Sequence, residues 1–319
     1  MYSTVYGHKR VKEKLSRLVS RGDLTGSFLF YGPPSIGKRT TAFLTAKYAL
    51  CLNQQEEDCT CESCRKFGSE HPDFMCVGQV DRIKVEDIDR ILDFTSVMPF
   101  TSDRKVIVLD NAESMTWEAG NRLLKLLEEP PDAVSIFLVT TDQNRLLPTI
   151  ISRCHDFQFK SLSVEDATNV LWKCLGFNLS EARVLGWIAS ESSVDVFSNA
   201  GLYLKHRNQA FDFVSIFKQR DIIETLDYVD KFDKTEIAVF VDMVILIMTD
   251  FLTLLYGLED IVNADMRDEM SKACRGFTDK ELLAMINVLS QTKKHAYLNI
   301  NLSTSFKSHL IRSFALLQR

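Results

Sequence analysis

Residues 28–38 read Phe-Leu-Phe-Tyr-Gly-Pro-Pro-Ser-Ile-Gly-Lys, and this stretch decides the fold of the 319-residue chain. Its apolar run predicts a short buried strand, and the Gly/Pro turn precedes a helix that begins at about Lys38. A P-loop requires this context, because N–H groups at a helix N-terminus bind phosphate and the lysine adds positive charge. We therefore expect Gly32, Gly37 and Lys38 to form a nucleotide site, with a tight turn that binds nothing as the alternative.

The first half of the chain alternates extended and helical patterns. Short apolar runs predict the strands, and helical patterns near 85–97 and 116–128 lie between them. Strands separated by helices are typical of a parallel α/β sheet. The expected strands are residues 28–31, 74–77, 106–109, 136–139 and 157–159.

The second half of the chain loses the strand patterns. Ser163 and Asp166 have the spacing of a capping box, which predicts a helix start, and Thr278 and Glu281 repeat it. We expect a small helical unit near residues 161–207 and helices from about residue 209 to the end. The predicted fold class is therefore α/β, a parallel-sheet P-loop module, followed by an all-α region.

One apolar stretch, residues 237–258, is long enough to cross a bilayer. Asp242 and Asp250 interrupt it, and a mid-membrane aspartate costs about 2.5–3.5 kcal/mol on insertion scales. A buried helix of a soluble domain is the better interpretation, and we expect no membrane partner.

The composition is that of an ordinary globular protein, with 45% hydrophobic and 25% charged residues. This excludes a disordered chain, a collagen and a small disulfide scaffold. The net charge of −5 argues against a protein that binds DNA alone, because such a protein usually has a basic domain. Residues 1–20 carry charges throughout and resemble no signal peptide, so we expect a reducing, cytoplasmic location.

Two positions, Arg39 and Asn111, depart from the pattern of a hydrolysing P-loop protein. Arg39 stands where Ser or Thr would ligate Mg²⁺ directly after the lysine. Thr40 comes next but is rotated by about 100° around the helix. Asp110 ends an apolar strand, the usual place of the Mg²⁺-holding acid, and Asn111 follows it. Nucleotide binding is compatible with this set, including Thr40 and Asp110, whereas metal-assisted hydrolysis is expected to be impaired.

Four of the eight cysteines, Cys51, Cys59, Cys61 and Cys64, lie within fourteen residues. In a reducing compartment such a cluster more often binds metal than forms disulfides. Four thiolates complete a tetrahedral shell, so we predict a structural zinc site. Four reduced cysteines without metal are the alternative, and His71 is near enough in sequence to replace one of them.

Three later segments resemble bacterial clamp-loader AAA+ subunits of DNA polymerase III. They are residues 119–131, 137–142 and 147–154, and the third contains the Ser152-Arg153-Cys154 signature of that family. The resemblance runs from about residue 5 to about 160 and continues weakly to residues 297–302. His71-Pro72-Asp73 also resembles a family segment that follows the zinc module, which argues against His71 as a ligand.

The resemblance implies an AAA+ domain at 1–160 with a zinc module at 51–64, a helical lid at 161–207 and a C-terminal helical collar at 208–319. It implies a ring with gamma/tau-type ATPase and delta-type subunits, which acts on a sliding clamp and primed DNA. Arg153 would reach the ATP of a neighbouring subunit. Hydrolysing relatives have a glutamate where this chain has Asn111, so we expect a weak or absent ATPase.

Other functions remain compatible with the sequence. An active clamp-loader ATPase could use Thr40 and Glu113 after local rearrangement. An AAA+ adaptor outside replication would have no clamp-loader partner. A zinc-dependent nucleic-acid binder is disfavoured by the negative net charge.

Overall fold

The computed structural model describes residues 1–53, 59–68, 70–79, 81–191, 195–296 and 302–317. Residues 297–301, which resemble a clamp-loader segment, lie outside this described part. The chain divides into two compact units, Met1–Leu162 and Ser163–Arg319.

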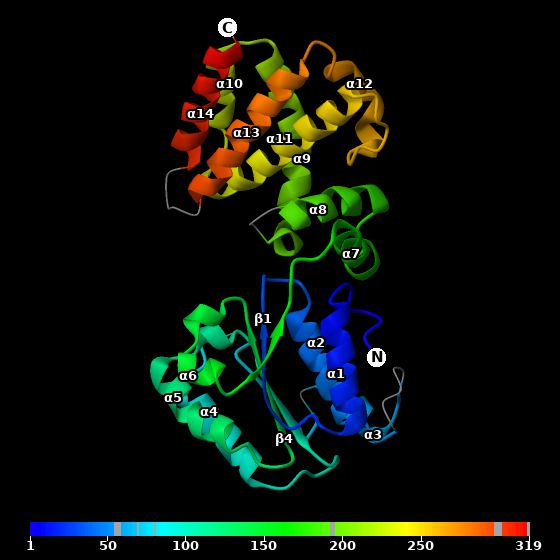
Figure 1. Ribbon diagram of the computed structural model, residues 1–319, viewed down its shortest axis with the longest axis vertical. Coiled ribbons are helices and arrows are strands. Elements are labelled where there is room, and N and C mark those ends of the chain that lie inside the picture. The colour runs from blue at the N-terminus through cyan, green and yellow to red at the C-terminus, as the bar shows by residue number, and fades with distance from the viewer. Residues whose placement is uncertain (54–58, 69, 80, 192–194, 297–301, 318–319) are drawn as a thin grey trace. The chain divides into compact units, whose positions relative to one another are not determined.

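The first unit is built on a five-stranded parallel sheet in the order β2-β3-β4-β1-β5 (Figure 1). All five predicted strands are present, with ends that differ from the prediction by at most two residues. Their bounds are β1 Gly26–Tyr31, β2 Phe74–Val77, β3 Lys105–Leu109, β4 Val134–Thr140 and β5 His155–Gln158.

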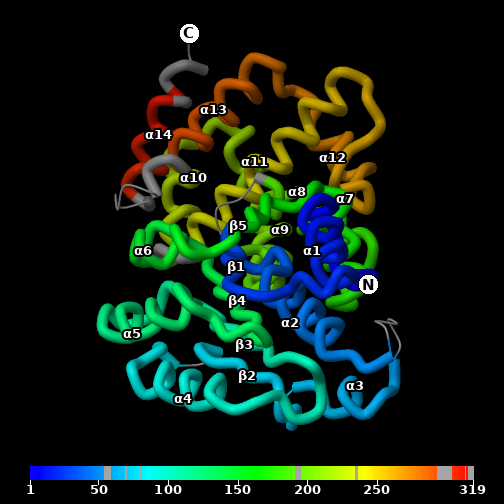
Figure 2. The backbone as a smooth tube through the Cα atoms, turned by 60° about the horizontal axis from the view of Figure 1, so that its bottom comes forward, coloured from blue at the N-terminus to red at the C-terminus, as the bar shows by residue number. Residues whose placement is uncertain are grey.

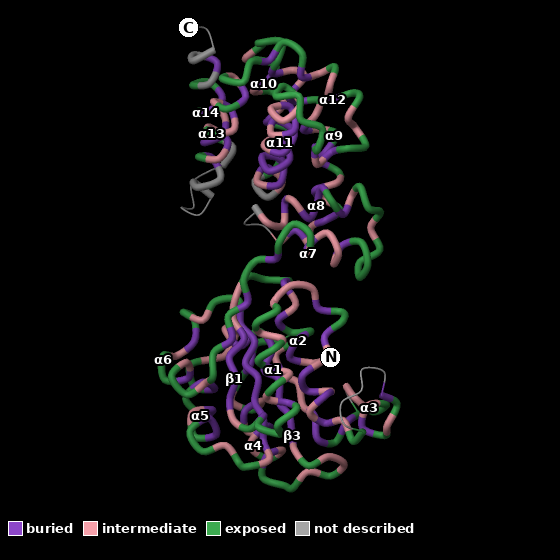
Figure 3. The backbone as a smooth tube through the Cα atoms, turned by 45° about the vertical axis from the view of Figure 1, so that its right-hand side comes forward, coloured by how far each residue is buried: buried purple, intermediate pink, exposed green. Residues whose placement is uncertain are grey.

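Strand β1 shows why these residues form a central strand. Successive side chains of a strand point to opposite faces, so Phe28 and Phe30 share one face and Leu29 takes the other. Phe28 stacks on Phe137 with ring centroids 5.2 Å apart, and Leu29 belongs to the apolar cluster on the opposite face. Both faces are therefore covered, as a parallel sheet requires (Figure 3).

Helices cover the two faces of the sheet, with α1 and α2 on one side and α4 and α5 on the other (Figures 1 and 2). Lys14 of α1 lies over the Phe157 ring at 4.3 Å, which places this helix against β5. The helices are α1 Lys9–Arg21, α2 Lys38–Ala49, α3 Glu62–Lys66, α4 Val85–Ser96, α5 Trp117–Glu128 and α6 Pro148–Ile151, with 3₁₀ turns η1 Ala112–Ser114 and η2 Gln143–Arg145.

Every element in the described part of the second unit is helical. Ser163 caps α7 by accepting from the Asp166 N–H at 3.1 Å, and Thr278 and Glu281 form the predicted reciprocal box before α13. The elements are α7 Val164–Asn169, a π-helical turn η3 Val170–Cys174, α8 Leu179–Glu191, α9 Val196–Lys218, α10 Ile222–Val229, α11 Lys234–Leu255, η4 Ala264–Met266, α12 Arg267–Ala273, α13 Asp279–Ala296 and α14 Leu302–Leu317.

The expected division of this unit into a lid and a collar remains a prediction. Helix α9 is continuous across the expected boundary at 207/208, and its kink is at Asn199. The boundary of the first unit, after Leu162, lies two residues beyond the expected one at 160.

Helix α11 is the apolar stretch that imitates a membrane span. Residues Glu236–Leu255 pass that test by length and composition, but 72% of the most apolar window is buried within the protein. Asp250 accepts hydrogen bonds from the N–H groups of Val262 and Asn263, each at 2.9 Å. The helix is buried in the helical unit, as predicted.

The strands of the parallel sheet run from one edge to the other, and we name these the amino edge and the carboxyl edge. The carboxyl edge is where the strands end, and it carries the P-loop after β1, Asp110 after β3 and Thr141 after β4. The amino edge is where the strands begin, and Asp73 and Arg153 precede β2 and β5 there.

Candidate functional site

The P-loop at the carboxyl edge has the backbone conformation that its glycines allow. Gly32 has φ +145°, and a Cβ at this position would lie 2.1 Å from the carbonyl oxygen of Phe159. Gly37 has φ +93° and immediately precedes α2. The His8 side chain braces the loop, with Nε2 2.8 Å from the Ile36 carbonyl oxygen. Gly32 is therefore needed for the close packing of the loop, and Gly37 for its left-handed backbone conformation.

Lys38, the lysine of the loop, is 5% exposed and folds back onto the loop itself. Its Nζ donates to the Gly32 carbonyl at 2.8 Å and to the Pro33 carbonyl. The ammonium group thus lies within the loop that would enclose phosphate. The phosphate-binding role of Lys38 stays a prediction.

Arg39 forms a contact that the sequence did not reveal. Its Nε lies 3.3 Å from Asp110 Oδ2, so the residue that replaces the Mg²⁺-binding hydroxyl pairs with the predicted Mg²⁺-binding acid. Burial raises the pKa of Asp110 above its usual value, and Arg39 opposes this shift only in part. Thr40 is exposed on α2.

The residues at this edge do not fit a magnesium ion. Mg²⁺ prefers near-octahedral oxygen ligands, and a P-loop supplies one from the residue after the lysine. Here that residue is a guanidinium, and it holds Asp110 Oδ2. The other oxygen, Oδ1, accepts the Asn111 N–H at 3.1 Å.

Asn111 and Glu113 complete this edge, and among the described residues Glu113 Oε2 has no hydrogen-bond partner. Asn111 has φ 49° and donates through Nδ2 to the Gly78 carbonyl at 3.1 Å. The Glu113 carboxylate accepts from the N–H of Thr141 at 3.0 Å and from its hydroxyl. Burial would raise the pKa of Glu113, but these hydrogen bonds hold it below the usual value.

The four cysteines converge as predicted. The sulfurs of Cys51, Cys59, Cys61 and Cys64 all lie within 4.8 Å of one another, an arrangement that could hold a metal such as zinc. Burial opposes ionisation of Cys61, but donors that include the Cys64 N–H lower the pKa of this thiol to about 6. The pKa of Cys64 is raised by burial and by the neighbouring sulfurs. Ionised thiolates at this spacing repel one another, and a bound cation would stabilise them together.

His71 is occupied elsewhere. Its Nε2 lies 2.8 Å from Ser63 Oγ, and its Nδ1 accepts the Asp73 N–H at 3.0 Å. With both ring nitrogens engaged, His71 is a support of the module and is not among the converging ligands.

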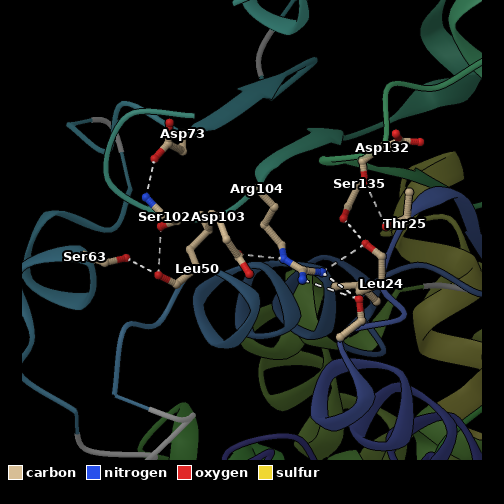
Figure 4. A network of polar contacts seen from close by, with 11 residues as sticks. Leu24, Thr25, Leu50, Ser63, Asp73, Ser102, Asp103, Arg104, Asp132 and Ser135 are labelled. Atoms are coloured by element: carbon tan, nitrogen blue, oxygen red, sulfur yellow. Dashed lines mark hydrogen bonds and ion pairs between the residues drawn. The ribbon is translucent and has the colours of Figure 1, made fainter. Parts of the chain in front are cut away.

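A hydrogen-bond network at the amino edge connects the cysteine module to the sheet (Figure 4). Ser63 and Ser102 both donate to the Leu50 carbonyl, at 2.6 and 3.0 Å. Asp73 is fully buried and accepts the N–H groups of Phe100, Thr101 and Ser102 at 2.6, 2.7 and 2.9 Å. Sequence reasoning missed this role, since a single aspartate before a strand gives no sign of three remote donors.

Arg153 lies at the amino edge. Its Nη2 is 2.5 Å from Glu128 Oε1, and its Nη1 donates to the Thr149 carbonyl at 2.9 Å. Strand β5 pairs with β1 so that His155 faces Phe28 and Gln158 faces Tyr31. The P-loop follows Tyr31, whereas Arg153 precedes His155. At about 3.3 Å per residue, the four residues of β5 alone separate them by about 13 Å.

Comparison of the sequence with known proteins shows which protein family the chain resembles. A family model described as DNA polymerase III, delta subunit, matches residues 7–163. The delta′ subunit of DNA polymerase III from Bacillus subtilis (strain 168) is 28% identical over 318 residues, which cover 95% of this chain and 94% of the relative. The chain belongs to the clamp-loader family of DNA polymerase III subunits.

Other members of the clamp-loader family match a shorter part of the chain. The tau subunit of Escherichia coli (strain K12) is 34% identical over 173 residues, which cover 53% of this chain and only 27% of that relative. Among solved structures, a gamma subunit-related protein from Thermotoga maritima covers 95% of this chain and 98% of its own, at 18% identity and a TM-score of 0.43.

Proposed function

We propose that this clamp-loader protein is a delta′-type subunit that loads the sliding clamp without hydrolysing ATP itself. The observation that carries the proposal is the match to a delta′ subunit over nearly the full length of both chains. The tau match, by contrast, covers about a quarter of the relative's length. The Arg39–Asp110 pair and Asn111 support the absence of hydrolysis, because both stand at positions that hydrolysis requires.

The second part of the proposal is that Arg153 acts in trans. Its own P-loop lies beyond the opposite edge of the sheet, so a phosphate that Arg153 reaches belongs to another subunit. A guanidinium suits this role because it stays charged and binds phosphate oxygens bidentately. The side chain is 34% exposed and is held by Glu128, which is itself 48% exposed. Arg153 can therefore exchange this partner for a phosphate at low cost.

The partners follow from the same proposal. A gamma/tau-type ATPase and a delta-type subunit would complete the ring, and the sliding clamp and primed DNA would be reached through the complex. The location would be the cytoplasm. Affinity purification of the tagged chain from its own cells, with mass spectrometry, should recover both subunits. Recovery of neither from cells that contain both would contradict the delta′ assignment.

The Arg153 role is tested in the assembled complex. Arg153→Ala should leave assembly intact and slow ATP hydrolysis at the neighbouring site, where arginines supplied in trans contribute roughly 10³–10⁵ in other phosphoryl-transfer systems. Arg145→Ala is a matched control, because Arg145 is an exposed arginine in the same segment. Turnover by the Arg153→Ala complex equal to that of the control would exclude the role.

We further propose that the cysteine cluster binds one structural zinc ion. Four converging sulfurs provide a closed tetrahedral shell, which leaves no position for a substrate. The purified chain should contain about one equivalent of zinc. Cys61→Ser should lower that content, whereas Cys274→Ser, at a buried cysteine of the helical unit, should not. A metal-free chain that is stably folded would contradict the assignment.

A further inference from the structure

Helix α1 concentrates positive charge in a chain whose net charge is −5. Its thirteen residues, Lys-Arg-Val-Lys-Glu-Lys-Leu-Ser-Arg-Leu-Val-Ser-Arg, contain six lysines and arginines and a single acid, Glu13. We propose that the exposed face of this helix binds the phosphate backbone of duplex DNA directly. The inference goes beyond the proposed function, in which DNA is reached through the complex.

Four of the six cations form a row along one face of α1. They are exposed and follow the helical spacing i, i+4, i+7 and i+11, as Arg10, Lys14, Arg17 and Arg21. At a rise of 1.5 Å per residue, the row is about 17 Å long. One strand of B-DNA carries a phosphate about every 3.4 Å along the helix axis, so about five phosphates span the same length. The row therefore has the length and the charge to follow one strand.

The side chains of the row are available to a ligand. Among the described residues, the Arg10 and Arg21 side chains form no hydrogen bond or ion pair. Arg17 pairs with Glu13 at 4.0 Å, but the two side chains are 72% and 48% exposed, so the pair contributes little. Lys14 lies over an aromatic ring of β5, where it keeps its charge. An anion can therefore meet the row without breaking a contact on which the fold depends.

The row ends beside a hollow in the first unit. A cavity of about 500 Å³ lies between the last turns of α1 and α2 and the segment 101–104, and Arg21 is among its lining residues. Asp103 also lines it, but its carboxylate pairs with Arg104 at 3.1 Å. The space leaves the Arg21 guanidinium free to turn toward a phosphate.

The composition of this face favours duplex DNA over other anionic partners. The apolar side of α1 faces the first unit, where Leu15 and Val19 are buried, so it is not free to enter a lipid surface. The row itself carries no apolar or aromatic side chain. A protein interface has an apolar core, and single-stranded DNA is bound by stacking on aromatic rings. A polar, arginine-rich row fits a duplex backbone, which is bound by charge without reading the sequence.

The first experiment measures binding of the full chain to a fluorescein-labelled duplex of about 20 base pairs by fluorescence anisotropy. The Debye length is about 10 Å at 0.1 M salt, so acids far from the row are screened and the net charge of −5 does not cancel it. We expect a dissociation constant of roughly 10⁻⁶–10⁻⁴ M at that salt concentration. The plot of log K against log salt should have a slope of about −3.6, since each of four phosphate contacts contributes about −0.9. No binding by about 0.1 mM chain at about 50 mM salt would overturn the proposal.

The second experiment removes the two arginines that have no partner among the described residues. Arg10→Ala combined with Arg21→Ala should weaken binding about tenfold or more at about 0.1 M salt and make the salt slope shallower by about 2. Lys272→Ala combined with Arg275→Ala is the matched control, because it removes the same charge from exposed positions of the second unit. Equal weakening by the two double variants would show that only net charge matters and would overturn the proposal.

Two further measurements keep the test specific. Thermal unfolding should be nearly unchanged in both double variants, because substitutions at exposed positions rarely destabilise a fold. Polyglutamate and vesicles of anionic lipid replace the duplex in the same assay, and binding to either that is as tight as binding to the duplex would overturn the assignment to DNA. Every assay uses the isolated chain, so failure of the delta′ assignment and failure of this inference are seen separately.

Discussion

Asp73 lies buried just before strand β2, and Asp110 lies buried just after the paired strand β3, at the opposite edge of the sheet. The pKa values of the two carboxyl groups are shifted in opposite directions. Asp73 receives three backbone N–H groups, which hold its pKa below the usual value although burial alone would raise it. Asp110 receives one N–H and the half-exposed Arg39, and burial prevails, so its pKa is raised.

The difference separates a structural carboxylate from one at the predicted nucleotide site. Backbone donors around Asp73 are fixed by the fold and belong to it permanently. The Asp110 carboxylate has only one backbone N–H donor, and its main partner is the Arg39 side chain, which can move. Perturbed, incompletely satisfied carboxylates of this kind are concentrated at functional sites.

The largest expected effect is at the amino edge. Asp73→Ala leaves three N–H groups without their charged acceptor, and each hydrogen bond to a charged group contributes about 1.5–3 kcal/mol. We expect the free energy of unfolding, from urea denaturation of the full chain, to fall by about 3 kcal/mol or more. Asp103→Ala removes an aspartate whose side chain is 77% exposed and should change it by less than about 0.5 kcal/mol. Equal losses in the two variants would refute the structural role of Asp73.

The pH dependence of stability should also distinguish the two aspartates. The pKa of Asp73 is lowered by folding, so its stabilisation is complete above the unfolded value of about 3.9 and is lost as the pH falls through the folded value. The stability gap between wild type and Asp73→Asn should therefore close below about pH 4. The pKa of Asp110 is raised, so wild type should instead gain stability relative to Asp110→Asn as the pH falls through the raised folded value toward about 3.9, above the range in which the Asp73 gap closes. Unfolding measured from pH 7 to 3 tests both signs, and parallel curves for the two variants would contradict the comparison.

At neutral pH, Asp110→Asn should have a small effect. The substitution removes a charge whose burial is unfavourable, and it leaves Arg39 half exposed to water. We expect the free energy of unfolding to change by less than about 1 kcal/mol, compared with about 3 kcal/mol for Asp73→Ala. Thermal unfolding of both variants in one buffer measures the two changes. A loss of stability in Asp110→Asn as large as that in Asp73→Ala would show that both acids are structural.

The smallest effect is expected at Glu128, which holds Arg153. Exposed ion pairs contribute about 0–1 kcal/mol, and this carboxylate is 48% exposed. Glu128→Gln should therefore change stability by less than about 1 kcal/mol and should leave Arg153 available to a neighbour. A large loss of stability would show that the pair is structural and would weaken the case for Arg153 in trans.

Much of the α/β unit could be predicted because its signals are local. The apolar runs predicted five strands, and the Gly/Pro turn before Lys38 predicted the P-loop. The spacing of Cys51, Cys59, Cys61 and Cys64 predicted a cluster that the fold brings together. Each of these signals depends on neighbouring residues and on the few conformations that they allow.

The sequence by itself determined which chemical groups are present: an arginine in place of a hydroxyl, an acid at a strand end, four thiols and the arginine of the Ser-Arg-Cys signature. Only the tertiary structure decided which of them meet. The order β2-β3-β4-β1-β5 inserts β4 between the P-loop strand and the Asp110 strand, and α2 packs onto β3 and β4, which lets Arg39 reach Asp110. The register of β5 on β1 sends Arg153 to the other edge. Strand order and register are set by packing between segments far apart in the chain, so no local pattern could have shown these pairings.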